Sequence, residues 1–374
     1  MQRNEIMRKV DNMNNKAIDA ARSLCDTMMR QFPEAANLPI EGRFFYHQGV
    51  FLSGMLRIYE LCNDEKYFEY VKKWVDSIID EKGNINSNEP QNWLDDIQPG
   101  ILLFPLYRKT GDERYKKALD YLIGILRNWS KNKAGGFWHS KIHQNQMWLD
   151  SLYMGSPIMA EYGASFRFPE LIDEAAVQAV IMYENMRDPE TGLMRHAWDE
   201  SKQEKWADKQ TGLSPEVWGR AQGWYVVAIL DILSFMPEKH PMRERLVAIE
   251  KELLQNIMKY RDGKTKLWYQ IVDKGDRTDN WIESSCSFLF TAAIARAVEM
   301  GILDESCKKF ANESFDGAMR NVVSRNDSDL LVENVCIGTC VFDYDGYIKR
   351  PKCVNDLHGS GAFLLMCTEI AKIN

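Results

Sequence analysis

Two aspartates stand in matching positions of the sequence. Asp95 and Asp150 each follow a Trp-Leu pair, and each comes just before a largely apolar segment. Two carboxyl groups that flank one sugar bond, with one kept protonated by its surroundings, are the usual machinery of glycoside hydrolysis. Asp is also a favoured N-cap, because its carboxylate accepts the free N–H groups of the first helical turn. A purely structural role for both residues is therefore an equally good interpretation at this point.

Histidines and tryptophans gather in the same parts of the chain. Five of the six histidines lie in six segments that precede or open apolar helices: 44–54, 92–100, 135–156, 195–200, 218–225 and 355–363. Aromatic faces beside polar groups suit sugar rings, which have apolar C–H faces and hydroxyl edges. The candidates for contact with a sugar are Tyr46, His139, Gln146, Trp148, His196, Arg220, Trp224 and His358.

A metal centre is a weaker interpretation of these histidines. His139 and His143 are four residues apart, which on a helix would place both on one face. Gly135 and Gly136 favour a loop there, and the chain has no HExxH pattern. Cys336 and Cys340 have no second pair nearby that would complete a zinc site. We expect no metal and no cofactor.

Two kinds of helical segment alternate along the chain. Amphipathic, charged segments are expected near 15–31, 64–81, 112–130, 168–187, 241–260 and 303–324. Segments that are apolar nearly all round are expected near 47–62, 95–110, 148–163, 216–235, 280–300 and 355–372. Asp64 and Asp112 are predicted N-caps of two amphipathic helices. Short strands are expected at 137–139, 194–198 and 268–272.

This alternation predicts an all-α fold, an (α/α)6 barrel in which six outer helices surround six inner ones. A length of 374 residues alone would favour two domains, but no linker divides the chain. We therefore interpret residues 1–374 as a single catalytic domain. The longer loops precede the inner helices, so the site is expected at that end of the barrel.

Charge and composition exclude several classes of partner. The net charge is −7 and no basic stripe occurs, which disfavours binding to nucleic acid. No apolar run has the length of a membrane span, and the polar N-terminus does not resemble a secretory signal. Eight scattered cysteines fit a reducing compartment. We expect a cytoplasmic protein whose partner is a small oligosaccharide.

A family resemblance rests on eight segments between about residues 40 and 370: HQGVFLSG, LDDIQPG, GGFWH, QMWLDSLYMG, HAWDE, SPEVWGRAQGWY, WYQIVDKGDRTDNWIESS and NDLHGSGAF. Together they resemble the unsaturated rhamnogalacturonyl hydrolases, glycoside hydrolase family 105. The unsaturated glucuronyl hydrolases share the barrel and some of these motifs. Ser151 is a departure, since the family pattern leads us to expect Gly there.

The resemblance implies hydrolysis of a 4-deoxy-4,5-unsaturated galacturonyl residue linked to rhamnose. The enzyme would protonate C4 of the enol ether, water would add at C5, and the aglycone would leave after the ring opens. Asp150 corresponds to the acid–base residue and Asp95 to the second carboxylate, while the eight candidates above correspond to residues of the sugar site. Protonation of carbon requires a neutral carboxyl, so we expect aromatic surroundings that disfavour the Asp150 anion. Arg220 would bind the uronate carboxylate or hold one of the aspartates.

Three other functions remain open on the sequence alone. An inverting glycosidase would use Asp95 and Asp150 as acid and base on a saturated sugar. A sugar epimerase is possible because this barrel also hosts such enzymes. A non-catalytic repeat protein would instead spread its polar residues over a concave face.

Overall fold

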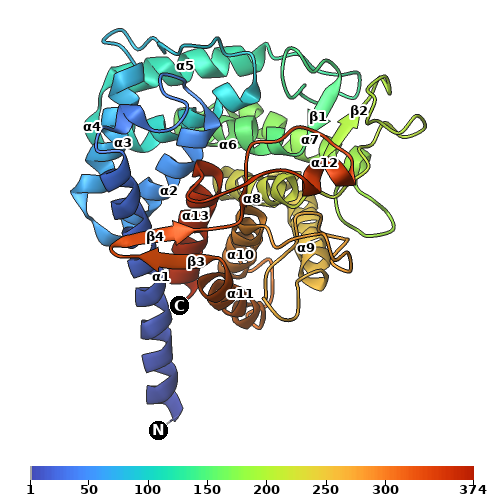
Figure 1. Ribbon diagram of the computed structural model, residues 1–374. Helices are drawn as coiled ribbons and strands as arrows, with labels where there is room; N and C mark the ends of the chain where they lie inside the picture. The colour runs from blue at the N-terminus through green and yellow to red at the C-terminus, as the bar shows by residue number, and fades with distance from the viewer. Residues whose placement is uncertain (1) are drawn as a thin grey trace.

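The computed structural model describes the backbone of residues 2–374 and the side chains of residues 13–374. Its helices form two concentric rings (Figure 1). The outer helices are α1 (Gln2–Gln31), α3 (Glu65–Ile78), α5 (Glu113–Arg127), α7 (Pro169–Met186), α9 (Arg243–Lys259) and α11 (Cys307–Asn321). The inner helices are α2 (Tyr46–Cys62), α4 (Leu103–Thr110), α6 (Asp150–Phe166), α8 (Gly219–Phe235), α10 (Ser284–Glu299) and α13 (Leu357–Ile373).

The inner ring closes on itself. Each inner element packs on the next in chain order, and α13 packs on both α10 and α2, so the last helix meets the first. The chain enters α4 through the 3-10 segment η3 (Gln98–Leu102), which supplies the contacts to α2 and α6. The predicted (α/α)6 barrel is confirmed, and an α-helix is found in each of the twelve expected segments. Two limits differ from the prediction: α1 begins at Gln2 and not near residue 15, and the segment expected at 95–110 is α-helical only from Leu103.

Burial explains why the two kinds of helix take their places. Every residue of α8 from 219 to 233 is buried, whereas α5 buries only one face. A helix that is apolar all round has to be surrounded, and an amphipathic one can cover it. The predicted caps are also confirmed: Asp64 accepts a hydrogen bond from the Lys66 N–H, and Asp112 accepts one from the Arg114 N–H at 3.0 Å.

Short pairings inside the long loops were harder to predict. β1 (Gln146–Trp148) pairs antiparallel with β2 (Ala197–Asp199), β3 (Val323–Asn326) with β4 (Asp329–Val332), and β5 (Val335–Cys336) with β6 (Lys352–Cys353). The expected strands at 137–139 and 268–272 form only isolated bridges, and the one expected at 194–198 is shifted to β2. A five-residue helix, α12 (Tyr344–Ile348), was not predicted. Elements of this length depend on long-range contacts rather than on a sequence period.

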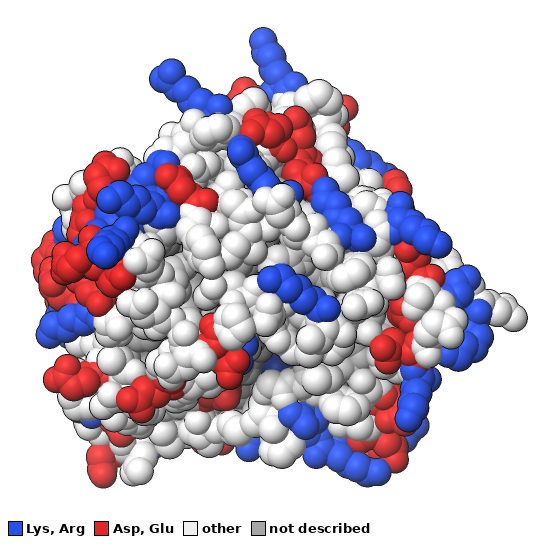
Figure 2. All heavy atoms as spheres, turned by 90° about the horizontal axis from the view of Figure 1, so that it is seen from above, with Lys and Arg blue, Asp and Glu red and all other residues white. Residues whose placement is uncertain are grey.

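The two ends of the barrel differ in character. The N-termini of the inner helices meet the long loops at one end. Figure 2 shows the molecule from above, with charged side chains mainly around the edge of this face and a hollow within it. Near the other end, Arg57 and Arg296 pair with Asp231, and Arg57 also reaches Glu369. These guanidinium groups lie where the negative ends of the inner helices converge. Among the described residues, no helix is long and apolar enough to cross a bilayer.

Candidate active site

A cavity of about 210 Å³ opens where the inner helices begin. One part of its wall comes from the loops and first turns of the early inner helices: Phe45, Tyr46, His47, Trp93, Asp95, His139, Trp148 and Asp150. Met154 and Trp218 contribute from α6 and from the residue before α8. The rest comes from a late loop that the sequence did not single out: Gly338, Thr339, Cys340, Phe342 and Arg350. Five of the ten predicted site residues therefore line one cavity.

Neither aspartate caps a helix through its carboxylate. Asp96, the neighbour of Asp95, is the residue that accepts hydrogen bonds from the Asn92 and Trp93 N–H groups, and Arg43 pairs with it. Asp150 is the first residue of α6, and its Oδ2 atom faces His196 instead of the helix backbone. One Asp95 oxygen is buried with no hydrogen-bond partner among the described residues. The structural interpretation of the two aspartates as N-caps is therefore wrong.

The two carboxyls hold protons unequally. Burial raises the pKa of Asp95 well above its ordinary value, and the charges of Asp150 and Asp96 raise it further. Burial also acts to raise the pKa of Asp150, but the hydrogen bond with His196 brings that pKa below its ordinary value. The expected neutral Asp150 is thus wrong for the free protein, because a hydrogen-bond donor outweighs the apolar surroundings. Asp95 therefore holds a proton more readily than Asp150 does.

His196 stands behind Asp150. Its Nε2 atom lies 3.1 Å from Oδ2 of Asp150, and its Nδ1 atom lies 2.5 Å from the hydroxyl of Tyr347 on α12. The imidazole is fully buried between the rings of Trp148 and Trp218. His196 therefore reaches the cavity only through the carboxyl of Asp150, not as the direct sugar contact that we expected.

His358 plays the corresponding part behind Tyr46. Its Nε2 atom lies 2.5 Å from the Tyr46 hydroxyl, and its Nδ1 atom bonds the Asp356 carboxylate. Burial and the charge of Arg220 lower the pKa of His358, so its ring is neutral. Asp356 can only accept, hence Nδ1 carries the hydrogen and Nε2 accepts from the phenol. The Tyr46 oxygen can therefore accept a hydrogen bond from a group in the cavity.

Aromatic stacking builds the wall beside Asp150. The rings of His139 and Trp148 are stacked, with centroids 4.1 Å apart and planes at 10°. Ser151, the departure from the family pattern, hydrogen-bonds His139 Nδ1 at 2.8 Å. Gln146 lies behind this pair, where it accepts from the Trp148 indole and donates to Glu204. Gln146 therefore orients Trp148 and does not line the cavity.

Arg220 has neither of its expected roles. Its guanidinium is 1% exposed and donates to the backbone carbonyls of Cys336 and Ile337, the latter at 2.9 Å. These bonds hold the late loop over the cavity. Arg350 is instead the guanidinium on the cavity wall; it donates to the Gly338 carbonyl, and its Nε atom has no partner among the described residues.

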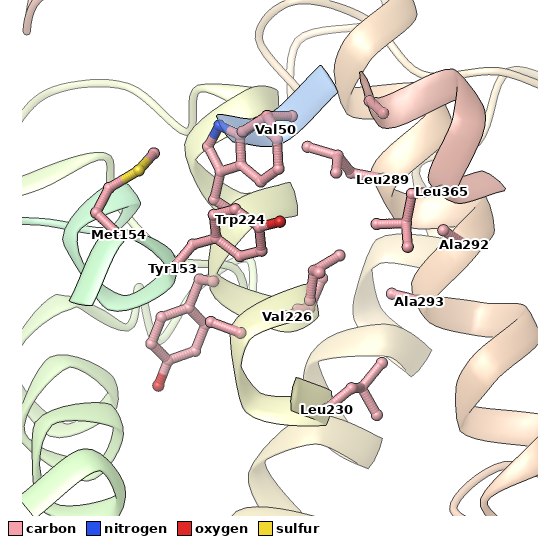
Figure 3. Packing of buried hydrophobic residues seen from close by; sticks show 14 of the residues in the cluster. Val50, Tyr153, Met154, Trp224, Val226, Leu230, Leu289, Ala292, Ala293 and Leu365 are labelled. Carbon is pink, nitrogen blue, oxygen red and sulfur yellow. The ribbon is translucent and has the colours of Figure 1, made fainter. Parts of the chain in front are cut away.

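Trp224 lies away from the cavity wall. It is 1% exposed, and its ring stacks on Tyr153 with centroids 4.5 Å apart. Figure 3 shows the two rings among Val50, Leu289 and other apolar side chains of the inner helices. The expected sugar contact of Trp224 is therefore corrected to a place in the core, because α8 is buried on every side.

The paired histidines of the 139–143 loop each hydrogen-bond a serine. Nδ1 of His139 bonds Ser151, and Nδ1 of His143 bonds Ser140. Their ring centroids are 6.1 Å apart, with Trp93 packed against both. Within residues 13–374, no group of three or more His, Cys, Asp or Glu side chains is placed to hold a metal ion.

Comparison with known proteins places this geometry in a family. The family model of Glycosyl Hydrolase Family 88 matches residues 20–374. The chain belongs to this family of glycoside hydrolases. A solved structure of a family 105 glycoside hydrolase from C. acetobutylicum is 33% identical to this hydrolase, with a TM-score of 0.89; the match covers 94% of this chain and 99% of the other. The family 105 resemblance is thus confirmed.

Two curated relatives of this hydrolase extend the comparison. Protein Atu3128 of Agrobacterium fabrum is 35% identical over 153 residues, which are 40% of this chain and 63% of that protein. The match thus spans less than two thirds of that relative's length. The unsaturated rhamnogalacturonyl hydrolase YesR of Bacillus subtilis is 24% identical over 331 residues, 87% of this chain and 88% of YesR.

Proposed function

We propose that this glycoside hydrolase removes a terminal 4-deoxy-4,5-unsaturated galacturonyl residue from short rhamnogalacturonan fragments made by a polysaccharide lyase. The observation that carries the proposal is the pair of unequally protonated carboxyls, Asp95 and Asp150, on one aromatic cavity. Likeness to a rhamnogalacturonyl hydrolase supports rhamnose as the aglycone. The small cavity suits one terminal ring better than the interior of a polymer.

The reaction requires a proton donor to carbon. Protonation of C4 breaks the C4=C5 double bond and leaves an oxocarbenium ion at C5. Water adds to C5 and gives up a proton, which forms a hemiketal. When the C5–O5 bond of the hemiketal breaks, C1 becomes a hemiacetal that expels the aglycone alcohol. One carboxyl that gives a proton to C4 and takes one from water is sufficient for this sequence.

Asp150 is the residue that we assign to this transfer, as the family motif implies. In the free protein it is a carboxylate that accepts a hydrogen bond from His196. A bound uronate adds a negative charge and excludes water, and both effects favour protonation of Asp150. Substrate binding should therefore raise the pKa of Asp150, so that this carboxyl carries the proton that is transferred to C4.

Asp95 is assigned to positioning. In its neutral form the carboxyl both donates and accepts a hydrogen bond, which suits sugar hydroxyls or the attacking water. The Tyr46 oxygen, whose hydrogen is directed to His358, accepts from a hydroxyl on the same wall. Trp148 and His139 offer a stacked aromatic surface for the ring.

A second candidate deserves a test because the pKa of Asp95 is raised and that of Asp150 is lowered. An inverting glycosidase needs one protonated carboxyl as acid and one carboxylate as base, and Asp95 and Asp150 would fit those states in the free protein. Such an enzyme would act on a saturated sugar. An unsaturated glucuronyl hydrolase is a closer alternative: lyase action makes C4 trigonal, so galacturonate and glucuronate yield the same unsaturated ring. Linkage and aglycone alone then separate these substrates.

The experiment compares four substrates with the purified protein. They are unsaturated galacturonyl-rhamnose, an unsaturated glucuronyl disaccharide from a glycosaminoglycan, saturated galacturonyl-rhamnose, and undigested pectin. We expect the first to be consumed fastest, with loss of its ultraviolet absorbance, and the last two to remain intact. Faster hydrolysis of the glucuronyl disaccharide would overturn the choice of aglycone. Cleavage of the saturated disaccharide would favour the inverting glycosidase.

A further inference from the structure

Tyr347 is held rigidly behind the catalytic cavity. It belongs to the five-residue helix α12, and its side chain is fully buried. Its ring stacks on Trp218, with centroids 5.7 Å apart and planes at 22°. Gln270 donates a hydrogen bond to the backbone carbonyl of Tyr347 at 3.3 Å. These contacts aim the phenol at His196, whose Nδ1 atom lies 2.5 Å from the Tyr347 hydroxyl.

The phenol decides which nitrogen of His196 carries a hydrogen. Burial raises the pKa of Tyr347 well above its ordinary value, so the hydroxyl keeps its proton. When that O–H donates to Nδ1, a neutral imidazole has its hydrogen on Nε2, which points at Asp150. The Asp150 carboxylate can accept a hydrogen bond from Nε2–H. A protonated Asp150 carboxyl would instead need an unprotonated Nε2 to accept its own hydrogen. The tautomer of His196 thus favours the carboxylate form of Asp150.

We propose that Tyr347 is a positioning residue which acts through His196 to set how readily Asp150 takes up a proton. The inference rests on the proposed function, in which Asp150 must be protonated before it can act. Tyr347 does not line the cavity, so it touches no substrate atom. Its effect on the reaction passes along the chain Tyr347, His196, Asp150.

Other titratable groups also face this chain and must be held constant. Asp150 is influenced by His139 and couples to Asp95 and Tyr46. Tyr347 lies within the influence of Glu216, which pairs with Lys274, and of Cys340. None of these groups is altered when one hydroxyl is removed from Tyr347. A difference between the pH profiles of the two proteins therefore reports on Tyr347 itself.

The test is Tyr347→Phe, which deletes the hydroxyl and keeps the ring that stacks on Trp218. His196 then loses the donor at Nδ1, and the tautomer with a bare Nε2 becomes accessible. That tautomer accepts a hydrogen bond from protonated Asp150. We expect the alkaline limb of the kcat profile on the unsaturated disaccharide to move up by about half to one pH unit, the size of one neutral hydrogen bond.

Tyr225→Phe is the matched control. Tyr225 is fully buried, and its hydroxyl donates to the Ala179 carbonyl at 2.6 Å, within the helical layers and not on the cavity wall. It should lower thermal stability much as Tyr347→Phe does and leave the limb in place. An unmoved or lowered limb in Tyr347→Phe, or an equal shift in Tyr225→Phe, would overturn the proposal. An inactive wild-type protein would instead refute the proposed function.

A measurement on the wild-type protein guards against a variant that fails to fold. The imidazole nitrogens of ¹⁵N-histidine-labelled protein can be observed by NMR, with His196 identified by the signals lost in His196→Gln. We expect a protonated Nε2 and an unprotonated Nδ1 for His196 in the free protein. Protonation at Nδ1 with a bare Nε2 would contradict the proposal without any Tyr347 variant.

Discussion

Asp95 and Asp150 line the same cavity, and their pKa values are shifted in opposite directions. The pKa of Asp95 is raised and that of Asp150 is lowered. The carboxylate of Asp150 is one of the causes that raise the pKa of Asp95, so the two sites titrate as a coupled pair. His196 breaks the symmetry because it faces only Asp150. A pair of similar residues at equivalent repeat positions thus acquires two different roles from its neighbours.

The first prediction concerns Asp150→Asn. Asn keeps the shape of the side chain, and its oxygen can still accept the hydrogen bond from His196, so the variant should fold with little change in Tm. Loss of the proton donor should lower kcat by about 10²–10⁴-fold, while the affinity for the unsaturated disaccharide largely persists. Turnover, binding and thermal melts measured together check this. Near wild-type turnover would show that another group supplies the proton.

The second prediction concerns the pH dependence of stability at Asp95. The pKa of Asp95 is raised in the folded protein. Its contribution to folding stability is therefore fully present below the unfolded pKa of about 3.9 and is lost as pH rises through the folded pKa. Asp95→Asn removes this loss, because the amide stays neutral. The Tm of the variant relative to wild type should therefore increase with pH.

Asp112→Asn provides a control of opposite sign. Its hydrogen bonds to Arg114 lower the pKa of Asp112, so its contribution is present above the unfolded pKa and is lost as pH falls through the folded value. The amount by which the Tm of Asp112→Asn lies below that of the wild type should therefore become smaller as the pH falls. Parallel slopes for the two variants would contradict the opposite pKa directions.

The third prediction concerns which arginine, Arg350 or Arg220, binds the uronyl carboxylate. Arg350 lies on the cavity wall, whereas Arg220 donates to loop carbonyls. Arg350→Gln should raise KM for the uronyl substrate by about tenfold or more, the size expected for loss of a charge-assisted hydrogen bond. The methyl ester of the substrate, which lacks the charge, should be affected much less. Equal effects on acid and ester would mean that Arg350 only supports the Gly338 loop.

The fourth prediction concerns a buried glutamate outside the site. Glu250 on α9 is fully buried, and neither carboxyl oxygen has a partner among the described residues. Burial raises its pKa well above the ordinary value. Glu250→Met should raise the free energy of unfolding by about 1–3 kcal/mol, with a gain that grows as pH rises.

Glu252 on the same helix is the matched control for that substitution. It accepts hydrogen bonds from Tyr183 and Arg187 at 2.7 and 2.8 Å, so Glu252→Met should be neutral or destabilising. A loss of stability in Glu250→Met equal to that in Glu252→Met would show that Glu250 has a partner that the protein needs.

The repeat pattern explains how much of this protein could be predicted from its sequence. Asp95 and Asp150 follow the same dipeptide at the same point of two repeats, so a ring of helices brings them together. Asp64 and Asp112 were predicted as caps for the same reason. Residues that recur at the same position of each repeat can be predicted from the sequence, because the barrel places them equivalently.

Residues outside the repeat pattern could not be placed in this way. Tyr347 and Arg350 come from a short helix and a loop almost 200 residues after Asp150, with no period to indicate their direction. Trp224 lies one helical turn from Arg220, but α8 is buried all round. Periodicity therefore gives no means to distinguish its cavity-facing side from its core side.

The most direct test of the central claim, protonation of C4, is hydrolysis of unsaturated galacturonyl-rhamnose in D₂O. The account predicts loss of the ultraviolet absorbance and one deuterium at C4 of the released uronyl product, detected by NMR. It predicts that Asp150→Asn slows both by about 10²–10⁴-fold. Release of rhamnose with the absorbance retained and no deuterium at C4 would contradict the account, because the glycosidic bond would then have broken without any proton transfer to carbon.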